Sequence, residues 1–207
     1  MSSPLLTSFE QRLSELEANF IVTRSDYNLY TPADFLNAVA YRLLASAALE
    51  HYVEQRCLEI ASSGADRLTK SRPTSTGRAL VIWARFQDRR QPRPVHIHEL
   101  DAVKDLSEAP AAFALYSKAV KRSHGISSDD LRTLVLPLGV RESQLPLVLM
   151  SSLENLADKR NPASHAVVRS RSEPATEVAL LKQILAPLHQ LDTDLQLMCD
   201  TFPTSNV

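Results

Sequence analysis

Glycine and aromatic residues are scarce in this sequence, and their scarcity narrows the class of fold. Four glycines and 6% aromatic side chains occur in 207 residues. Leucine, alanine, glutamate and arginine are common instead, which favours helix. A chain of this length is large enough for one domain with a substantial core. We therefore predict a single all-α domain that spans residues 1–207.

Features of secreted and membrane proteins are also missing. The two cysteines, Cys57 and Cys199, lie in helical patterns among apolar neighbours, so we expect buried thiols and no disulfide framework. No apolar stretch approaches the roughly 18 residues that a membrane-spanning helix needs. The first four residues lack the basic and apolar regions of a signal peptide. We expect a cytoplasmic protein with no part in the membrane.

An excess of positive charge is absent as well. The formal net charge is −1, so no overall basic field attracts nucleic acid, and any contact with it must come from a local patch. The sequence has no glycine-rich phosphate loop and no Gly-x-Ser-x-Gly elbow. His96 and His98 alternate, but no further ligands follow at zinc-site spacing, so we expect no metal and no cofactor.

Helical periodicity dominates the rest of the chain. Thr7 and Glu10 have capping-box spacing and predict the start of the first helix. Thr31 as cap and Pro32 as first residue predict a long second helix, which should end at Ser62-Ser63-Gly64.

A loop-rich insertion is expected at about 65–111, between the second helix and the helices that follow. Within it, residues 80–86 fit a helix or a short strand equally well. The prediction for the whole chain is a helical bundle with this insertion.

The stretch from Arg160 to His165 carries the clearest signal of chemistry. Pro162 should end the preceding helix near Arg160, with Asn161 as N-cap of the next helix and Pro162 as its first residue. Residues five apart on an unbroken helix point about 140° apart, so we expect the break to let Arg160 and His165 converge. An arginine, a histidine and a helix N-terminus around one point would suit a phosphate.

Glu50 lies on the predicted face of the second helix, in a line of apolar residues that Ser46 also interrupts. A buried carboxylate needs a partner, and Arg160 or His165 would supply one. Alternatively, Glu50 lies at the edge of the core or pairs with a surface cation.

Arg160-Asn161-Pro162-Ala163-Ser164-His165, late in an all-α chain, resembles the Arg-Asn-x-x-x-His motif of the HEPN superfamily. The motif is preceded by Leu49-Glu50-His51-Tyr52, which looks like the acidic-aromatic segment of many members. The order of His124-Gly125-Ile126, Leu138-Gly139-Val140 and the motif is similar to the RiboL-PSP-HEPN branch. The resemblance implies a metal-independent RNA endonuclease, often a toxin or antiviral effector, that works as a homodimer. It also leaves open a non-catalytic module that binds a protein partner or a nucleotide.

The residues of the motif suit this chemistry. His165 can accept or donate a proton near neutral pH, and Arg160 offers a planar, permanently charged fork to phosphate oxygens. Asn161 either orients the phosphate or only caps the helix. Arg169 and Arg171 either hold flanking RNA phosphates or form a solvated basic loop. The expected partners are an RNA substrate, a second copy of the chain and an antitoxin or regulatory protein.

Overall fold

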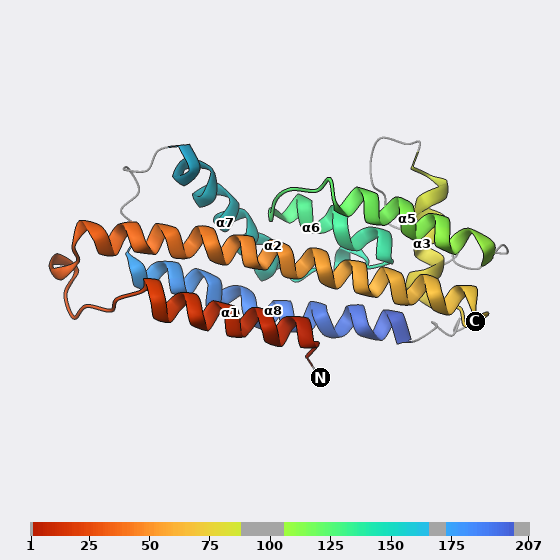
Figure 1. The fold of residues 1–207 in the computed structure, drawn as a ribbon, viewed down its shortest axis with the longest axis horizontal. Coiled ribbons are helices and arrows are strands. Elements are labelled where there is room, and N and C mark those ends of the chain that lie inside the picture. Colours follow the sequence, from red (N-terminus) through yellow and green to blue (C-terminus); the bar gives the residue numbers. More distant parts are fainter. Residues whose placement is uncertain (1, 88–105, 166–172, 201–207) are drawn as a thin grey trace. The chain divides into compact units, whose positions relative to one another are not determined.

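The computed structural model describes residues 2–87, 106–165 and 173–200, with residues 106 and 159–165 described by their backbone alone. The described residues form helices and no strand, so the predicted all-α class is confirmed (Figure 1). The α-helices are α1 (Pro4–Phe20), α2 (Pro32–Thr69), α3 (Ser75–Arg85), α5 (Ala109–Val120), α6 (Ser128–Val135), α7 (Leu147–His165) and α8 (Pro174–Asp200). Short 3-10 turns lie at Tyr27–Leu29, Leu106–Glu108, Leu136–Leu138 and Glu142–Gln144.

Backbone contacts divide the chain into two compact units. The first holds Met1–Tyr52, Gly125–Ser128 and Pro146–Gln190, and the second holds Val53–His124, Asp129–Leu145 and Leu191–Val207. The long helices α2 and α8 contribute residues to both units. The first unit contains α7 and Glu50, and therefore the part of the predicted site that the structure describes.

The start of α2 follows the sequence prediction closely. Thr31 precedes the helix, and its hydroxyl accepts the Asp34 amide at 3.2 Å. The Asp34 carboxylate accepts the Thr31 amide in return at 2.8 Å. This reciprocal capping holds the first turn of the helix. The prediction for α1 is wrong, because Ser3 caps it and Pro4 begins it, one turn before Thr7.

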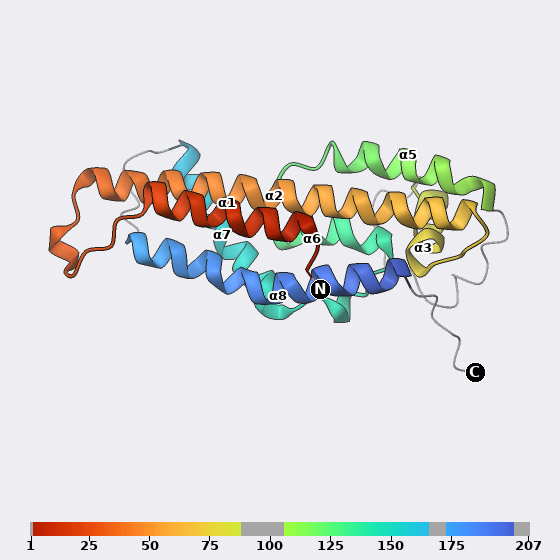
Figure 2. The same ribbon diagram turned by 60° about the horizontal axis from the view of Figure 1, so that its bottom comes forward.

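In the first unit, α1 packs on the early half of α2 and on α8. The rings of Phe9 and Tyr52 stack with centroids 5.4 Å apart, and Glu10 on α1 meets His189 on α8 at 2.7 Å. Figure 2 shows α1 lying along both helices. Apolar side chains fill the space between the helices of this unit, among them Leu6, Leu13, Leu16, Leu49, Leu153 and Leu181.

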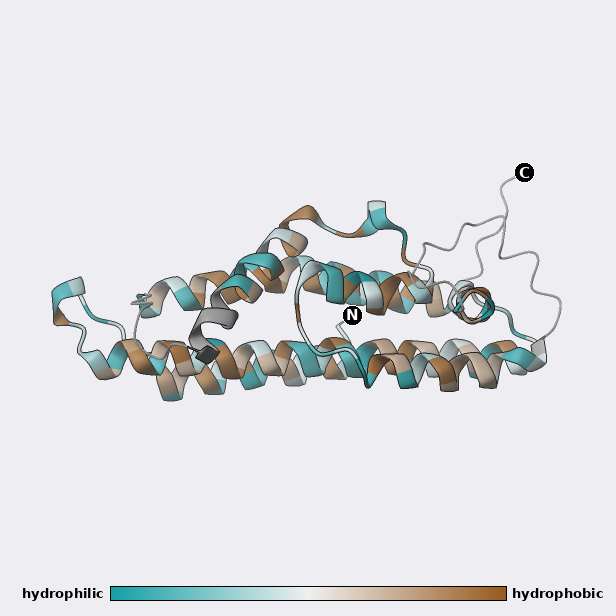
Figure 3. Cartoon of the chain, turned by 90° about the horizontal axis from the view of Figure 1, so that it is seen from above, coloured by the Kyte–Doolittle hydropathy of each residue, from teal (hydrophilic) through white to brown (hydrophobic). Residues whose placement is uncertain are grey.

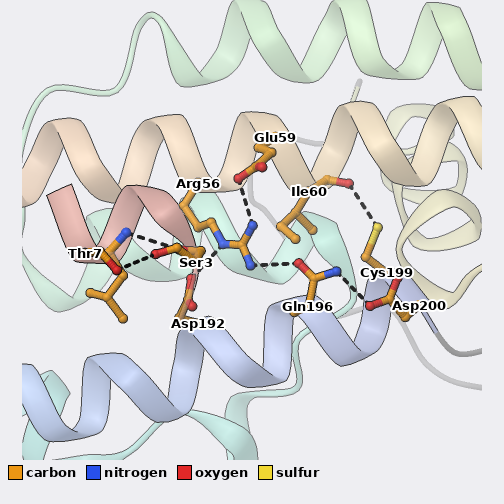
Figure 4. Close-up of polar contacts among 10 residues, drawn as sticks. Ser3, Thr7, Arg56, Glu59, Ile60, Asp192, Gln196, Cys199 and Asp200 are labelled. Atoms are coloured by element: carbon orange, nitrogen blue, oxygen red, sulfur yellow. Dashed lines mark hydrogen bonds and ion pairs between the residues drawn. The ribbon is translucent and has the colours of Figure 1, made fainter. Parts of the chain in front are cut away.

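In the second unit, an aromatic pair and an arginine network join the helices. Trp83 on α3 meets Tyr116 on α5 edge to face at 5.6 Å. Arg56 on α2 donates to Asp192 of α8 at 2.7 Å and to Gln196 at 3.0 Å (Figure 4). Because Arg56 is buried, these acceptors satisfy a charge that burial alone would disfavour.

The predicted end of α2 at Gly64 is wrong, since the helix continues to Thr69. A Cβ on Gly77 at the start of α3 would overlap the carbonyl oxygen of Gly64. The two glycines therefore let α3 approach α2, and Gly64 serves this contact instead of ending the helix. The stretch that the sequence left between helix and strand belongs to α3, so the described part of the 65–111 insertion is more helical than expected.

Polar and apolar residues alternate along the helices (Figure 3). None of the described helices combines the length and the apolar character that a membrane crossing requires.

Candidate functional site

The motif lies on an unbroken helix. α7 runs from Leu147 through His165, so the predicted break at Asn161, with Asn161 as an N-cap, is wrong. An N-cap stabilises a helix start by about 0.5–2 kcal/mol, and a proline inside a helix destabilises it by about 3 kcal/mol. Both are local preferences of a size that the rest of a fold can override. The same chain carries Pro187 inside α8, so a proline within a helix is not confined to the motif.

The unbroken helix changes the geometry expected of Arg160 and His165. Five helical steps rotate their backbone positions about 140° apart around the axis of α7. The helix break that was expected to let both residues converge on one point is therefore absent. The side chains of Arg160, Asn161 and His165, and the whole of Arg169 and Arg171, lie outside the described part of the structure.

Within the first unit, α7 crosses the early half of α2, and its motif-bearing end projects away from that helix (Figure 1). The early half of α2 is also the segment that carries Glu50. The proximity of Glu50 to the motif therefore stays a prediction.

Glu50 is half-buried and binds backbone. Its Oε1 accepts the Gly125 amide at 2.9 Å. Gly125 has φ of 150°. This conformation favours glycine, because in other residues the Cβ atom would clash with the adjacent main chain. The neighbouring Leu49 and Tyr52 are buried in the core. The structure thus places Glu50 at the edge of the core, and its pairing with Arg160 or His165 stays a prediction.

A second carboxylate binds the same short stretch of chain. Glu154, on α7, accepts both the amide and the hydroxyl of Ser128, the amide at 3.0 Å. Between the two contacts, Ile126 is buried in the core. Residues 125–128 are therefore held at one end by α2, at the other by α7, and in the middle by apolar packing.

A buried ion pair in the first unit was missed by the sequence reasoning. Arg42 on α2 donates to Glu177 on α8 at 2.7 Å, and both side chains are almost wholly buried. The Nε and Nη2 of Arg42 have no hydrogen-bond partner in the described structure. A signal was present, because Arg42, Ser46 and Glu50 follow one another at steps of four, which places them along one side of a helix.

Ser46, which interrupts the apolar line of α2, is fully buried. Its hydroxyl donates to the Arg42 carbonyl at 2.7 Å, so the side chain satisfies itself within its own helix.

No group of three or more metal-ligating side chains occurs among the residues that the structure describes. His96 and His98 lie outside those residues. Comparisons of the chain with protein-family models, with curated proteins and with solved structures gave no match.

Proposed function

We propose that this chain is a metal-independent RNA endonuclease with a HEPN-like bundle, acting as a homodimer. The observation that carries the proposal is the six-residue sequence from Arg160 to His165. It lies at the end of α7 in a chain whose described part is helical. α2, which α7 crosses, carries the acidic residue Glu50 that the resemblance calls for.

The proposed reaction needs only groups that RNA and the motif contain. The ribose 2′-oxygen attacks the adjacent phosphorus, and the bond from phosphorus to the 5′-oxygen breaks. His165 accepts the 2′-hydroxyl proton while water protonates the leaving 5′-oxygen, or His165 protonates the leaving oxygen while water accepts the 2′-hydroxyl proton. Arg160 stabilises the added negative charge with its guanidinium. The products are a 2′,3′-cyclic phosphate and a 5′-hydroxyl.

The unbroken α7 favours a site that two copies complete. Because Arg160 and His165 start from positions about 140° apart on one helix, one phosphodiester is more easily reached by the Arg160 of one copy and the His165 of the partner subunit. Asn161 would orient the phosphate, since the helix leaves it no capping role. Arg169 and Arg171 would hold flanking phosphates of the RNA.

Two alanine variants test the proposal. In EDTA, the wild type should cut RNA and leave 2′,3′-cyclic ends, whereas Arg160→Ala and His165→Ala should each lower the rate at least 100-fold, about the contribution of one acid–base or electrostatic group. Circular dichroism should show the same helix content in all three proteins. Full activity in both variants, or cleavage that requires a divalent ion, would overturn the proposal.

We also propose that the nuclease is a toxin or defence effector restrained by an antitoxin or regulatory protein. Expression of the wild type should then arrest growth, while His165→Ala should not. If the wild type binds a protein tightly and damages no RNA, the non-catalytic module is the better description.

A further inference from the structure

Residues 125–128, here called the strap, connect the helix that carries Glu50 to the helix that carries the motif. At its start, the Gly125 amide donates to Glu50 on α2. At its end, the Ser128 amide and hydroxyl donate to one carboxylate oxygen of Glu154 on α7. The two ends of the strap are at most about 10 Å apart, because only three residue-to-residue steps join Gly125 to Ser128.

The strap has the features of a fixed connection. Gly125 adopts a backbone conformation that other residues rarely take. Ile126, with 2% of its surface exposed, anchors the middle in the core. Hydrogen bonds to a carboxylate are stronger than those between neutral groups. Both carboxylate contacts use a main-chain amide, so the backbone itself, and not only a side chain, is held.

The position of Glu154 on α7 allows the strap to influence where the motif lies. Glu154 precedes Arg160 by six residues, which is about 9 Å along the axis of a helix. A shift or rotation of α7 at Glu154 would therefore move the motif as well. Displacements of about 1 Å at reacting groups can lower a rate about 100-fold.

We infer that Ser128 and Glu154 are positioning residues of the proposed nuclease site, which hold the motif-bearing helix against α2 through the strap. This inference rests on the proposed function. Ser128 and Glu154, which lie outside the motif, would position it. Glu50 would support the other end of the strap through its hydrogen bond to the Gly125 amide.

The test compares three variants on α7. Glu154→Ala removes the acceptor, and Glu154→Gln keeps an oxygen that can accept from Ser128. Asp158→Ala removes another exposed carboxylate one turn nearer to the motif. We expect Glu154→Ala to lower kcat for RNA cleavage about tenfold or more with little change in KM. Glu154→Gln and Asp158→Ala should stay within about threefold of the wild type, because neither removes the acceptor from the strap.

Hydrogen exchange supplies a readout that needs no RNA. The Ser128 amide and the last two turns of α7 should exchange faster in Glu154→Ala than in Asp158→Ala. Equal exchange in these variants, or equal kcat, would overturn the inference even if the wild type is a nuclease. If the wild type cuts no RNA, the proposed function fails, while the exchange result still decides whether the strap holds α7.

Discussion

At the scale of single residues, burial controls the protonation of two groups near the helix contacts. Burial raises the pKa of the Cys57 thiol from 9.0 to about 12. The pKa of Tyr41 also rises, from 10.0 to about 12, because its hydroxyl is buried and the carboxylates of Glu17 and Glu177 disfavour a phenolate. Both groups therefore keep their protons in the folded chain at pH values where the unfolded chain releases them.

Stability should consequently fall at alkaline pH. The contribution of each group is complete below its unfolded pKa, near 9 for Cys57, and is lost as the pH rises toward about 12, at up to about 1.4 kcal/mol per pH unit for each proton. Urea denaturation at about pH 8 and about pH 10.5 measures the loss. Cys57→Ala removes one titrating group, so its free energy of unfolding should fall less over this range. An identical fall in wild type and variant would contradict the assignment.

The sequence predicted many of these residues correctly, because composition and spacing report on burial. Cys57 and Cys199 are buried free thiols as expected, and Thr31 occupies its predicted position before α2. Ser46 was harder to place, because a hydroxyl that bonds the preceding turn of its own helix can be buried with little penalty. The partner of Glu50 could not be deduced, since a backbone amide 75 residues away leaves no trace in the local pattern.

At the scale of helices, a buried ion pair joins α2 and α8 within the first unit. Arg42 and Glu177 face each other in the first unit with almost no exposure. Removing one member of such a pair leaves a buried charge, whereas replacing both by apolar residues removes the charges together.

Arg42→Met should therefore lower the free energy of unfolding by about 3–5 kcal/mol, and Arg42→Met combined with Glu177→Met should recover most of it. Lys70→Met, which breaks the exposed pair with Asp66, is the control and should change stability by less than about 1 kcal/mol. Urea denaturation gives all three values. A double variant as unstable as Arg42→Met alone would show that the pair does not act through its charges.

Helix ends were less predictable than helix existence. The signals at Gly64 and at Asn161-Pro162 are local preferences, and both helices continue through them. At Gly64 the reason is a close approach of α3, which depends on Gly77 and not on neighbours in sequence. The predicted geometry of the candidate site was affected most, because it depended on a helix break inferred from the local signal at Pro162.

At the scale of the whole chain, composition and periodicity were enough for the all-α class. They did not anticipate the division into two compact units, because such a division depends on contacts between distant segments. The strap and the Arg42–Glu177 pair are also long-range features, which appear only when α2, α7 and α8 are assembled. The motif itself is local, so the sequence alone could locate it but could not orient its residues.

The proposed two-copy site makes a prediction about mixed dimers. A dimer purified with one Arg160→Ala chain and one His165→Ala chain retains one complete pair, the arginine of one copy with the histidine of the other. Such a dimer should have about half of the wild-type activity, because closed two-fold symmetry gives the wild type two equivalent sites.

RNA cleavage by this mixed dimer in EDTA is the measurement that tests the central claim most directly. Either variant alone should cut RNA at least 100-fold more slowly than the wild type, and the mixed dimer should reach about half of the wild-type rate. A mixed dimer as inactive as the single variants, beside an active wild type, would contradict it.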